Sequence, residues 1–207
     1  MKELTTNLKT LKNVVKIFSK SELEANIDEL RRLQTEIIDF MNKVPCAGIA
    51  APQFGENYPV FGLNDRKEVV FSPTIKKYGK NLVNNIEGCL SFPKINTITE
   101  RSSSIDASYF VLEGDNFKLV NTKIMNFPAI VFQHETDHIY GNLMMDRSVT
   151  HFASQFTQST TQKLFQINSN DFGYDYFLEN ENVLFFGEKQ IDPKDYPNCK
   201  IAGIKNE

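Results

Sequence analysis

The sequence has few histidines and few cysteines, and it lacks both a long hydrophobic run and a marked excess of one charge. A net charge of −3 leaves no basic footprint for nucleic acid and no cationic patch for a membrane surface. The apolar runs are far shorter than the roughly 20 residues of a transmembrane helix, and the first residues lack the apolar core of a signal peptide. These absences predict a cytoplasmic protein that binds neither nucleic acid nor membrane.

The cysteines, at positions 46, 89 and 199, are odd in number and widely spaced. This pattern argues against a disulfide scaffold and favours a reducing compartment. With 207 residues, 41% of them hydrophobic and 24% charged, the chain is large enough for one globular domain with a sizeable core.

Two of the three histidines, His134 and His138, stand four residues apart with Glu135 between them. Four residues are about one helical turn, so both imidazoles project from one face and can bind a divalent metal ion. The glutamate can then act as a general base toward water at that ion. The alternative is an amphipathic helix whose histidines are satisfied by core hydrogen bonds. We disfavour it because histidine is otherwise so rare in this chain.

The neighbouring residues predict the helix that carries this motif. Asn126 is placed to cap it, Pro128 falls near the first turn, and Gly141 is placed to end it. The histidine face is predicted to be the buried face, because apolar residues share its spacing of three and four. The residues on this face are Phe127, Ile130, Val131, His134, His138 and Gly141.

Metal sites of this kind generally use three protein ligands, and the third ligand decides the class. In the proteolytic pattern H-E-x-x-H-x-x-G-x-x-H, the last position is Met144 here, and no glutamate follows the motif until Glu179. His151 is an option but has no motif around it. Cys89 stands within Glu-Gly-Cys-Leu-Ser (87–91), and its thiolate would complete a Cys/His/His site.

The remaining pattern predicts an α+β domain. A capping box at Ser21 and Glu24 opens a core-packed helix that runs to about Met41. Residues 113–116 (Glu-Gly-Asp-Asn) predict a hairpin turn, and an aromatic tail from Phe172 predicts a strand pair. Short strands are expected at Tyr58–Leu63, Glu68–Phe71, Ile95–Thr99, Ser104–Leu112 and Lys118–Met125.

Three segments together resemble the signature motifs of peptide deformylases: Gly48–Gln53 (Gly-Ile-Ala-Ala-Pro-Gln), Glu87–Ser91 and Gln133–His138. Their order and approximate spacing are those of the family. The resemblance implies antiparallel sheets that surround a central HExxH helix, within a catalytic domain over residues 1–150. Residues 151–207 are then an extension, expected to pack on the same domain, with no assigned role.

The implied activity is removal of the formyl group from N-formylmethionyl peptides of newly made proteins, including peptides on the ribosome. The resemblance makes Cys89, His134 and His138 the ligands of one divalent ion, ferrous iron natively, with zinc, nickel or cobalt as substitutes. Glu135 would take a proton from the metal-bound water, so that hydroxide attacks, and would then hand the proton to the leaving amine. Glu87 would support the thiolate.

The resemblance also implies how a peptide is held. The Gln53 side-chain amide and the Leu90 N–H would stabilise the oxyanion. The peptide would lie along Gly48 and Ile49 as an added strand. Its first side chain would enter an apolar pocket lined by Phe127, Ile130 and Val131.

Two positions depart from the family pattern, and both concern substrate binding. Cys46 replaces the first glycine of the glycine-rich motif, and we expect it to be a buried small hydrophobe. Asn96 replaces an arginine that contacts the peptide backbone, with Arg101 the nearest basic residue. We therefore expect an intact metal site and an altered or weakened peptide preference. An endopeptidase and a peptide-binding protein with reduced activity are the alternatives.

Overall fold

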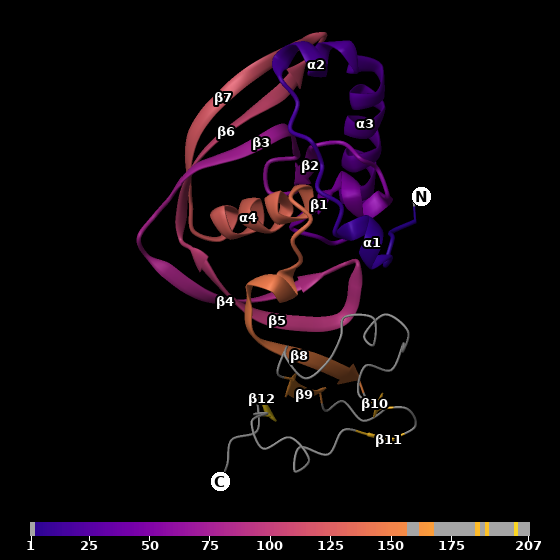
Figure 1. Cartoon of the computed structure of the whole chain (residues 1–207), viewed down its shortest axis with the longest axis vertical. Helices are drawn as coiled ribbons and strands as arrows, with labels where there is room; N and C mark the ends of the chain where they lie inside the picture. Colours follow the sequence, from indigo (N-terminus) through magenta and orange to yellow (C-terminus); the bar gives the residue numbers. More distant parts are fainter. Residues whose placement is uncertain (1–2, 157–161, 168–184, 187–188, 191–200, 203–207) are drawn as a thin grey trace. The chain divides into compact units, whose positions relative to one another are not determined.

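The computed structural model describes residues 3–156, 162–167, 185–186, 189–190 and 201–202 (Figure 1). The chain divides into two compact units, each made of two segments. The first comprises Met1–Val83 and Arg101–Leu143, and the second comprises Asn84–Glu100 and Met144–Glu207. Among the described residues, no helix combines the length and the apolar character needed to cross a membrane.

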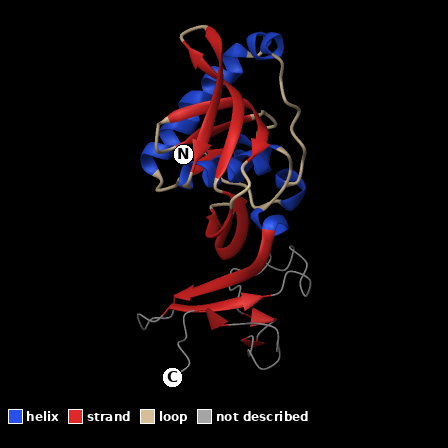
Figure 2. Cartoon of the chain, turned by 90° about the vertical axis from the view of Figure 1, so that its left-hand side faces the viewer, coloured by secondary structure: helices blue, strands red, loops and turns tan. Residues whose placement is uncertain are grey.

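The first unit is built on a five-stranded antiparallel sheet in the order β1-β2-β3-β6-β7 (Figures 1 and 2). Helices α1 (Leu8–Leu11), α2 (Lys20–Ala25), α3 (Ile27–Lys43) and α4 (Phe127–Ile139) and the 3-10 turn η1 (Ala51–Phe54) accompany it. The strands are β1 (Gly48–Ala50), β2 (Val60–Leu63), β3 (Glu68–Tyr78), β6 (Ser104–Glu113) and β7 (Asn116–Met125). The expected α+β class with antiparallel sheets is confirmed.

The predicted hairpin turn joins β6 to β7. Glu113 pairs with Asn116, so Gly114 and Asp115 form a two-residue loop. Gly114 has φ +59, the left-handed conformation that favours glycine in such loops. The prediction of a turn over residues 113–116 is therefore confirmed.

The helix predicted to begin at a Ser21 capping box is wrong in its start and in its continuity. Ser19 is the N-cap: its N–H donates to Glu22 Oε2 (2.8 Å), and its hydroxyl accepts from the Glu22 N–H (3.4 Å). Ser19 and Ser21 both have a glutamate three positions later, but only Ser19 has the extended backbone of a cap (φ −68, ψ 166). Asn26 then interrupts the helix between α2 and α3 with φ −113 and ψ 19.

Helix α3 buries the face that its apolar spacing predicts, and it packs on β2 at Gly62. A Cβ at Gly62 would lie 2.8 Å from both Cε and Sδ of Met41 and would also collide with Ile37. The close approach therefore requires glycine. The buried residues of the helix are Leu30, Leu33, Ile37, Phe40 and Met41.

Helix α4 begins after Asn126, with Pro128 in the first turn, as predicted. The capping prediction is wrong in detail, because the Asn126 side chain makes no cap hydrogen bond and its backbone has φ 60 and ψ −141. The C-cap is Tyr140, and Gly141 follows it with φ +68, so the predicted end is confirmed.

The expectation of one buried face on α4 is wrong. Buried residues run through Ala129–Gln133 and Glu135–Ile139, whereas Phe127, placed on the buried face, is 56% exposed. The helix packs against β1, β2, β3, β6 and β7, so it buries most of its circumference rather than a stripe. Phe132 of α4 belongs to the buried hydrophobic core and packs edge-on against Phe61, with the two ring centroids 5.0 Å apart.

The second unit contains a sheet in the order β12-β9-β8-β5-β4, with antiparallel pairing of β5 with β8 and of β8 with β9. The predicted strand Ile95–Thr99 falls within β5, but β4 was not predicted, because its alternation is broken by Asn84 and Asn85. The elements are β4 (Leu82–Cys89), β5 (Phe92–Ser102), η2 (Met144–Arg147), β8 (Ser148–Phe156), β9 (Gln162–Ile167), β10 (Phe185–Phe186), β11 (Lys189–Gln190) and β12 (Ile201–Ala202).

The predicted domain division at residue 150 stays a prediction, as does the packing of residues 151–207 on the same domain. Of the aromatic tail expected to form a strand pair, the stretch from Phe172 to Phe177 lies outside the described residues, whereas Phe185–Phe186 form β10, which pairs with β11.

Candidate metal centre

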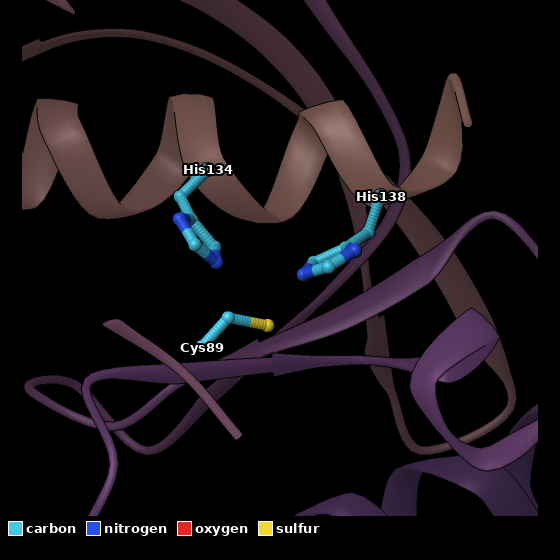
Figure 3. Close-up of side chains that lie close together, drawn as sticks. All are labelled: Cys89, His134 and His138. Atoms are coloured by element: carbon cyan, nitrogen blue, oxygen red, sulfur yellow. The ribbon is translucent and has the colours of Figure 1, made fainter. Parts of the chain in front are cut away.

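The two histidines of the motif lie one turn apart on α4, as the spacing predicts. Their ring centroids are 5.1 Å apart with an interplanar angle of 74°. His138 is buried and His134 is half-buried. Both rings extend from the same side of the helix (Figure 3).

Cys89 is the last residue of β4, and its side chain points toward the two imidazoles (Figure 3). One donor atom of each residue, the Cys89 sulfur and a ring nitrogen of His134 and of His138, lies within 4.8 Å of the other two. Zinc-type ions bond to thiolate at about 2.3 Å and to imidazole at about 2.0–2.1 Å. One ion therefore reaches all three donors after small side-chain adjustments, and one thiolate with two imidazoles suits zinc, iron, cobalt or nickel.

Glu135 lies between the histidines in sequence and is 4% exposed. Its side chain lies directly against the backbone of Gly48 in β1, where an added Cβ would be 2.7 Å from Glu135 Oε1. Strand β1 is at one end of the first sheet and pairs with β2. The structure thus places the predicted base beside the strand along which the peptide is predicted to lie.

Gln53 is buried in η1, and its side-chain oxygen accepts a hydrogen bond from the Ala50 N–H (2.9 Å). This bond fixes the plane of the amide, in which Nε2 is the donating atom. Leu90 follows Cys89 in the turn between β4 and β5 and is half-buried. The oxyanion roles of both residues stay predictions.

A pocket of about 190 Å³ lies beside the N-terminus of α4. It contains two of the three residues predicted to form the substrate pocket, Phe127 and Val131. Ile130 and Ile49 are buried and do not line it. The pocket is lined by Cys46, Ala47, Asn64, Asp65, Phe127, Pro128 and Val131.

The polar part of this pocket was missed by sequence reasoning. Asn64 and Asp65 follow β2, and nothing in their local pattern indicates where they lie. Two hydrogen bonds hold Asn64 against the glycine-rich segment: its side chain donates to the Cys46 carbonyl (2.6 Å), and its N–H donates to the Ala47 carbonyl (2.9 Å). The pocket therefore has an apolar wall from α4 and a polar wall from the β2–β3 turn.

Cys46 differs from the buried hydrophobe that was expected, because it is half-buried and lines the pocket. Burial, and to a smaller extent the nearby negative charge of Glu135, together raise the pKa of its thiol from the usual 9.0 to about 11. The thiol is thus held in its neutral form near the predicted base. It is a wall of the pocket rather than a further metal ligand.

Arg101 is not available to take the role of the arginine that the family pattern has at the position of Asn96. It is 4% exposed, and its Nη1 lies 2.7 Å from Oδ2 of Asp137, with which it forms a buried ion pair. Asn96 pairs through its backbone with Phe152 in the second sheet, and its side chain is outside the described structure.

Glu87 lies two residues before Cys89 in β4, and its support of the thiolate stays a prediction. The Thr99 hydroxyl donates to Glu87 Oε1 at 2.6 Å, and both residues are buried. This bond joins the C-terminal parts of β4 and β5. The α+β fold and the three donors together define a candidate metal-binding protein.

Comparison with known proteins identifies a family within this class. The model of the family described as polypeptide deformylase matches residues 5–153, and the chain belongs to that family. Peptide deformylase 1B of Arabidopsis thaliana is 36% identical over 127 residues, which are 58% of this chain and 45% of the relative. A Thermotoga neapolitana peptide deformylase is 34% identical over 122 residues, covering 58% of this chain and 73% of the relative.

Solved structures agree with this assignment. The actinonin-bound class I type b peptide deformylase of Acinetobacter baumannii has a TM-score of 0.62 and 28% identity, covering 70% of this chain and 95% of that chain. Peptide deformylase 1B of Arabidopsis thaliana with an inhibitor has a TM-score of 0.62 and 29% identity, covering 72% and 82%. The chain spans about half the length of the plant relatives that it matches, 45–48%.

Proposed function

We propose that this protein is a metal-dependent hydrolase that removes the formyl group from N-formylmethionyl peptides of newly made proteins. One observation carries the proposal: the donor atoms of Cys89, His134 and His138 lie within 4.8 Å of one another, on a chain that belongs to the polypeptide deformylase family. A Met-Ala-Ser-bound relative from Acinetobacter baumannii (28% identity, TM-score 0.59) supports a peptide substrate.

The proposed ligands are these three residues, and the proposed ion is ferrous iron, with zinc, nickel or cobalt as substitutes. The family membership supports a central HExxH helix between antiparallel sheets, and the burial of α4 is in line with it. When bound, a divalent ion supplies the Lewis acidity that makes water a nucleophile near neutral pH.

The protein's own groups supply the proton transfers. Glu135 accepts a proton from the attacking water and delivers it to the leaving amine, so that formate and a free amino terminus are produced. Its burial against Gly48 keeps the carboxylate in one position. The Gln53 amide and the Leu90 N–H donate to the oxygen on which negative charge develops.

The peptide binds as an added strand along Gly48 and Ile49, through backbone hydrogen bonds at the end of the first sheet. The pocket beside α4 receives the first side chain. Phe127 and Val131 supply its apolar wall, and Ile130, although it does not line this pocket, supports the same stretch of helix. The odd, widely spaced cysteines support a cytoplasmic location, and peptides on the ribosome are the proposed substrates.

A second candidate is a deformylase-like protein that binds peptides with an altered preference or reduced activity. Two observations favour it: Cys46 lines the pocket, and Arg101 is engaged with Asp137. An endopeptidase is disfavoured by Met144, which stands where a third histidine would be needed.

The test is anaerobic purification and metal analysis, followed by an assay of formate release from formyl-Met-Ala-Ser. About one ion per chain with formate release supports the deformylase. Metal without formate release supports the peptide-binding alternative, and absence of metal overturns both.

A Glu135→Gln variant should retain the ion and lose turnover, since it keeps the shape of the side chain but removes the base. Unchanged turnover in that variant would contradict the mechanism.

A further inference from the structure

Each histidine of the metal motif is directly preceded by a residue that is anchored outside the helix. Asp137 precedes His138 and forms the buried ion pair with Arg101 (2.7 Å). Gln133 precedes His134, and its side chain makes two hydrogen bonds to the backbone of Ser102, the residue that follows Arg101. Gln133 Nε2 donates to the Ser102 carbonyl (2.8 Å), and the Ser102 N–H donates to Gln133 Oε1 (3.2 Å).

These contacts join two adjacent residues at the end of β5 to two residues one turn apart on α4. We call Arg101, Ser102, Gln133 and Asp137 the helix clamp. None of the four is more than 7% exposed. Two anchor points one turn apart restrict both the sliding of a helix along its axis and its rotation about that axis.

Rotation matters because of where the histidines stand. Successive side chains on a helix are about 100° apart, so fixing residues 133 and 137 also fixes the directions in which His134 and His138 leave the helix. A small rotation of α4 would carry both imidazoles away from Cys89 together, since both extend from the same side (Figure 3).

The clamp is itself held by the sheet. The Ser102 hydroxyl lies 2.9 Å from the Gly79 carbonyl oxygen and 2.7 Å from that of Ser104. Ser103, the next residue, contacts the start of α4: its carbonyl accepts a hydrogen bond from the N–H of Asn126, the N-cap residue (2.7 Å). Residues 101–103 are therefore bonded both to their neighbours in the sheet and to α4.

Stability alone is a weak reason for this arrangement. A buried ion pair can often be replaced by apolar residues of similar volume with no loss of stability, because desolvation offsets the attraction. What apolar packing does not reproduce is the directional restraint of an arginine on a carboxylate and of a side-chain amide on a peptide group.

We propose that the helix clamp consists of positioning residues that set the rotation of α4 and hence the geometry of the histidine donors. This inference rests on the proposed metal-dependent function, since it concerns how the ion's ligands are oriented. None of the four residues is proposed to contact the ion or the substrate.

The test compares three Co²⁺-loaded proteins with the wild type. Gln133→Met removes both contacts to Ser102, together with the bond from Gln133 Nε2 to the Ala129 carbonyl (2.8 Å), at nearly constant volume. The double variant Arg101→Met/Asp137→Leu replaces the ion pair by an apolar pair. Thr136→Val is the matched control: Thr136 lies on the same turn and is 4% exposed, and its hydroxyl has no hydrogen-bond partner among the described residues. The readouts are the Co²⁺ absorption spectrum, the Co²⁺ dissociation constant, kcat, KM and Tm.

Both clamp variants are expected to shift the Co²⁺ ligand-field bands and to weaken Co²⁺ binding by about 10- to 100-fold, the usual effect of losing an outer partner of a ligand. Their kcat should fall by a similar factor with KM within about twofold, while Thr136→Val matches the wild type. A fourth variant, Arg101→Lys, keeps the charge but not the planar guanidinium fork, so it should give a smaller loss than Arg101→Met/Asp137→Leu.

Variants that fold with a normal Tm and have the spectrum, Co²⁺ affinity and kcat of Thr136→Val would overturn the positioning role while leaving the proposed function intact. A wild type without a thiolate-to-Co²⁺ band would overturn both. If one clamp variant fails to fold, the other still decides, because the two remove different anchor points.

Discussion

A methyl group on Gly48 would stand 2.7 Å from Oε1 of Glu135 and 2.8 Å from its Cγ. Real side chains do not pack so closely, so the glycine of β1 and the glutamate of α4 require each other's shape. The strand that is predicted to pair with the peptide thus also forms one wall around the predicted base.

Gly48→Ala is expected to displace Glu135 and to lower kcat by about 10- to 100-fold, since small misplacements of a catalytic group cost rates of this order. Steady-state formate release measures it. The control is Gly62→Ala, which introduces the same methyl group against Met41, away from the candidate site. A Gly48→Ala enzyme with wild-type kcat would show that Glu135 adapts without cost.

Gly62→Ala is expected to affect stability instead of activity. The added methyl group overpacks the contact between α3 and β2, which should cost about 1–3 kcal/mol of unfolding free energy. Urea unfolding followed by circular dichroism measures this loss, and kcat per folded molecule should equal that of the wild type. A fall in kcat with stability unchanged would reverse the assignment.

Cys46→Gly should enlarge the pocket beside α4. We expect kcat/KM for formyl-Met-Ala-Ser to rise relative to that for formyl-Ala-Ala-Ser by up to about tenfold, within the range for small volume changes in a pocket. Cys46→Ser, nearly equal in volume to the wild type, should leave the ratio unchanged. Equal shifts in both variants would mean that the chemistry of the thiol, rather than its volume, sets the preference.

The raised pKa of Cys46, about 11, predicts a pH dependence. Only the thiolate is alkylated, so the rate for Cys46 with iodoacetamide should rise about tenfold per pH unit from pH 7 to 10, without levelling near pH 9. Site-resolved mass spectrometry separates this cysteine from the others. In Glu135→Gln the pKa should be lower, because the carboxylate charge is one of its causes.

The same shift has a consequence for stability. The folded-state pKa of the Cys46 thiol is above its usual value of 9.0. Its contribution to stability is therefore fully present below about pH 9 and is lost as the pH rises through about 11. Unfolding free energies measured over this interval should fall less steeply in Cys46→Ser, and identical slopes would contradict the shift.

Removing the proposed sulfur ligand should remove the metal. Cys89→Ala is expected to bind Co²⁺ or Zn²⁺ at least about 100-fold more weakly, since even outer partners of a ligand can cost that much. Competition with a chelator measures it. Cys46→Ala is the matched control and should keep about one ion per chain, because Cys46 lines the pocket and is outside the donor set. Equal metal loss from both variants would contradict the assignment.

Local pattern predicted the elements whose signals are local. The hairpin at Gly114 depends on a two-residue turn, and α4 depends on a proline near its start and a glycine after its end. The spacing of His134 and His138 placed both on one turn of that helix, because helical periodicity acts over four residues. The same logic was wrong for α2 and α3, where two overlapping capping boxes compete and only the backbone of Ser19 is extended.

The sequence by itself determined the residue types of the candidate site, the helix that carries two of its donors, and the motifs that indicate the family. The tertiary structure alone decided which distant residues surround them. Arg101 and Asp137 are 36 positions apart, and Asn64 reaches the Cys46 carbonyl from 18 positions away. Such pairings arise from strand order and packing, which no local period encodes, because the free energy that selects them is summed over the whole core.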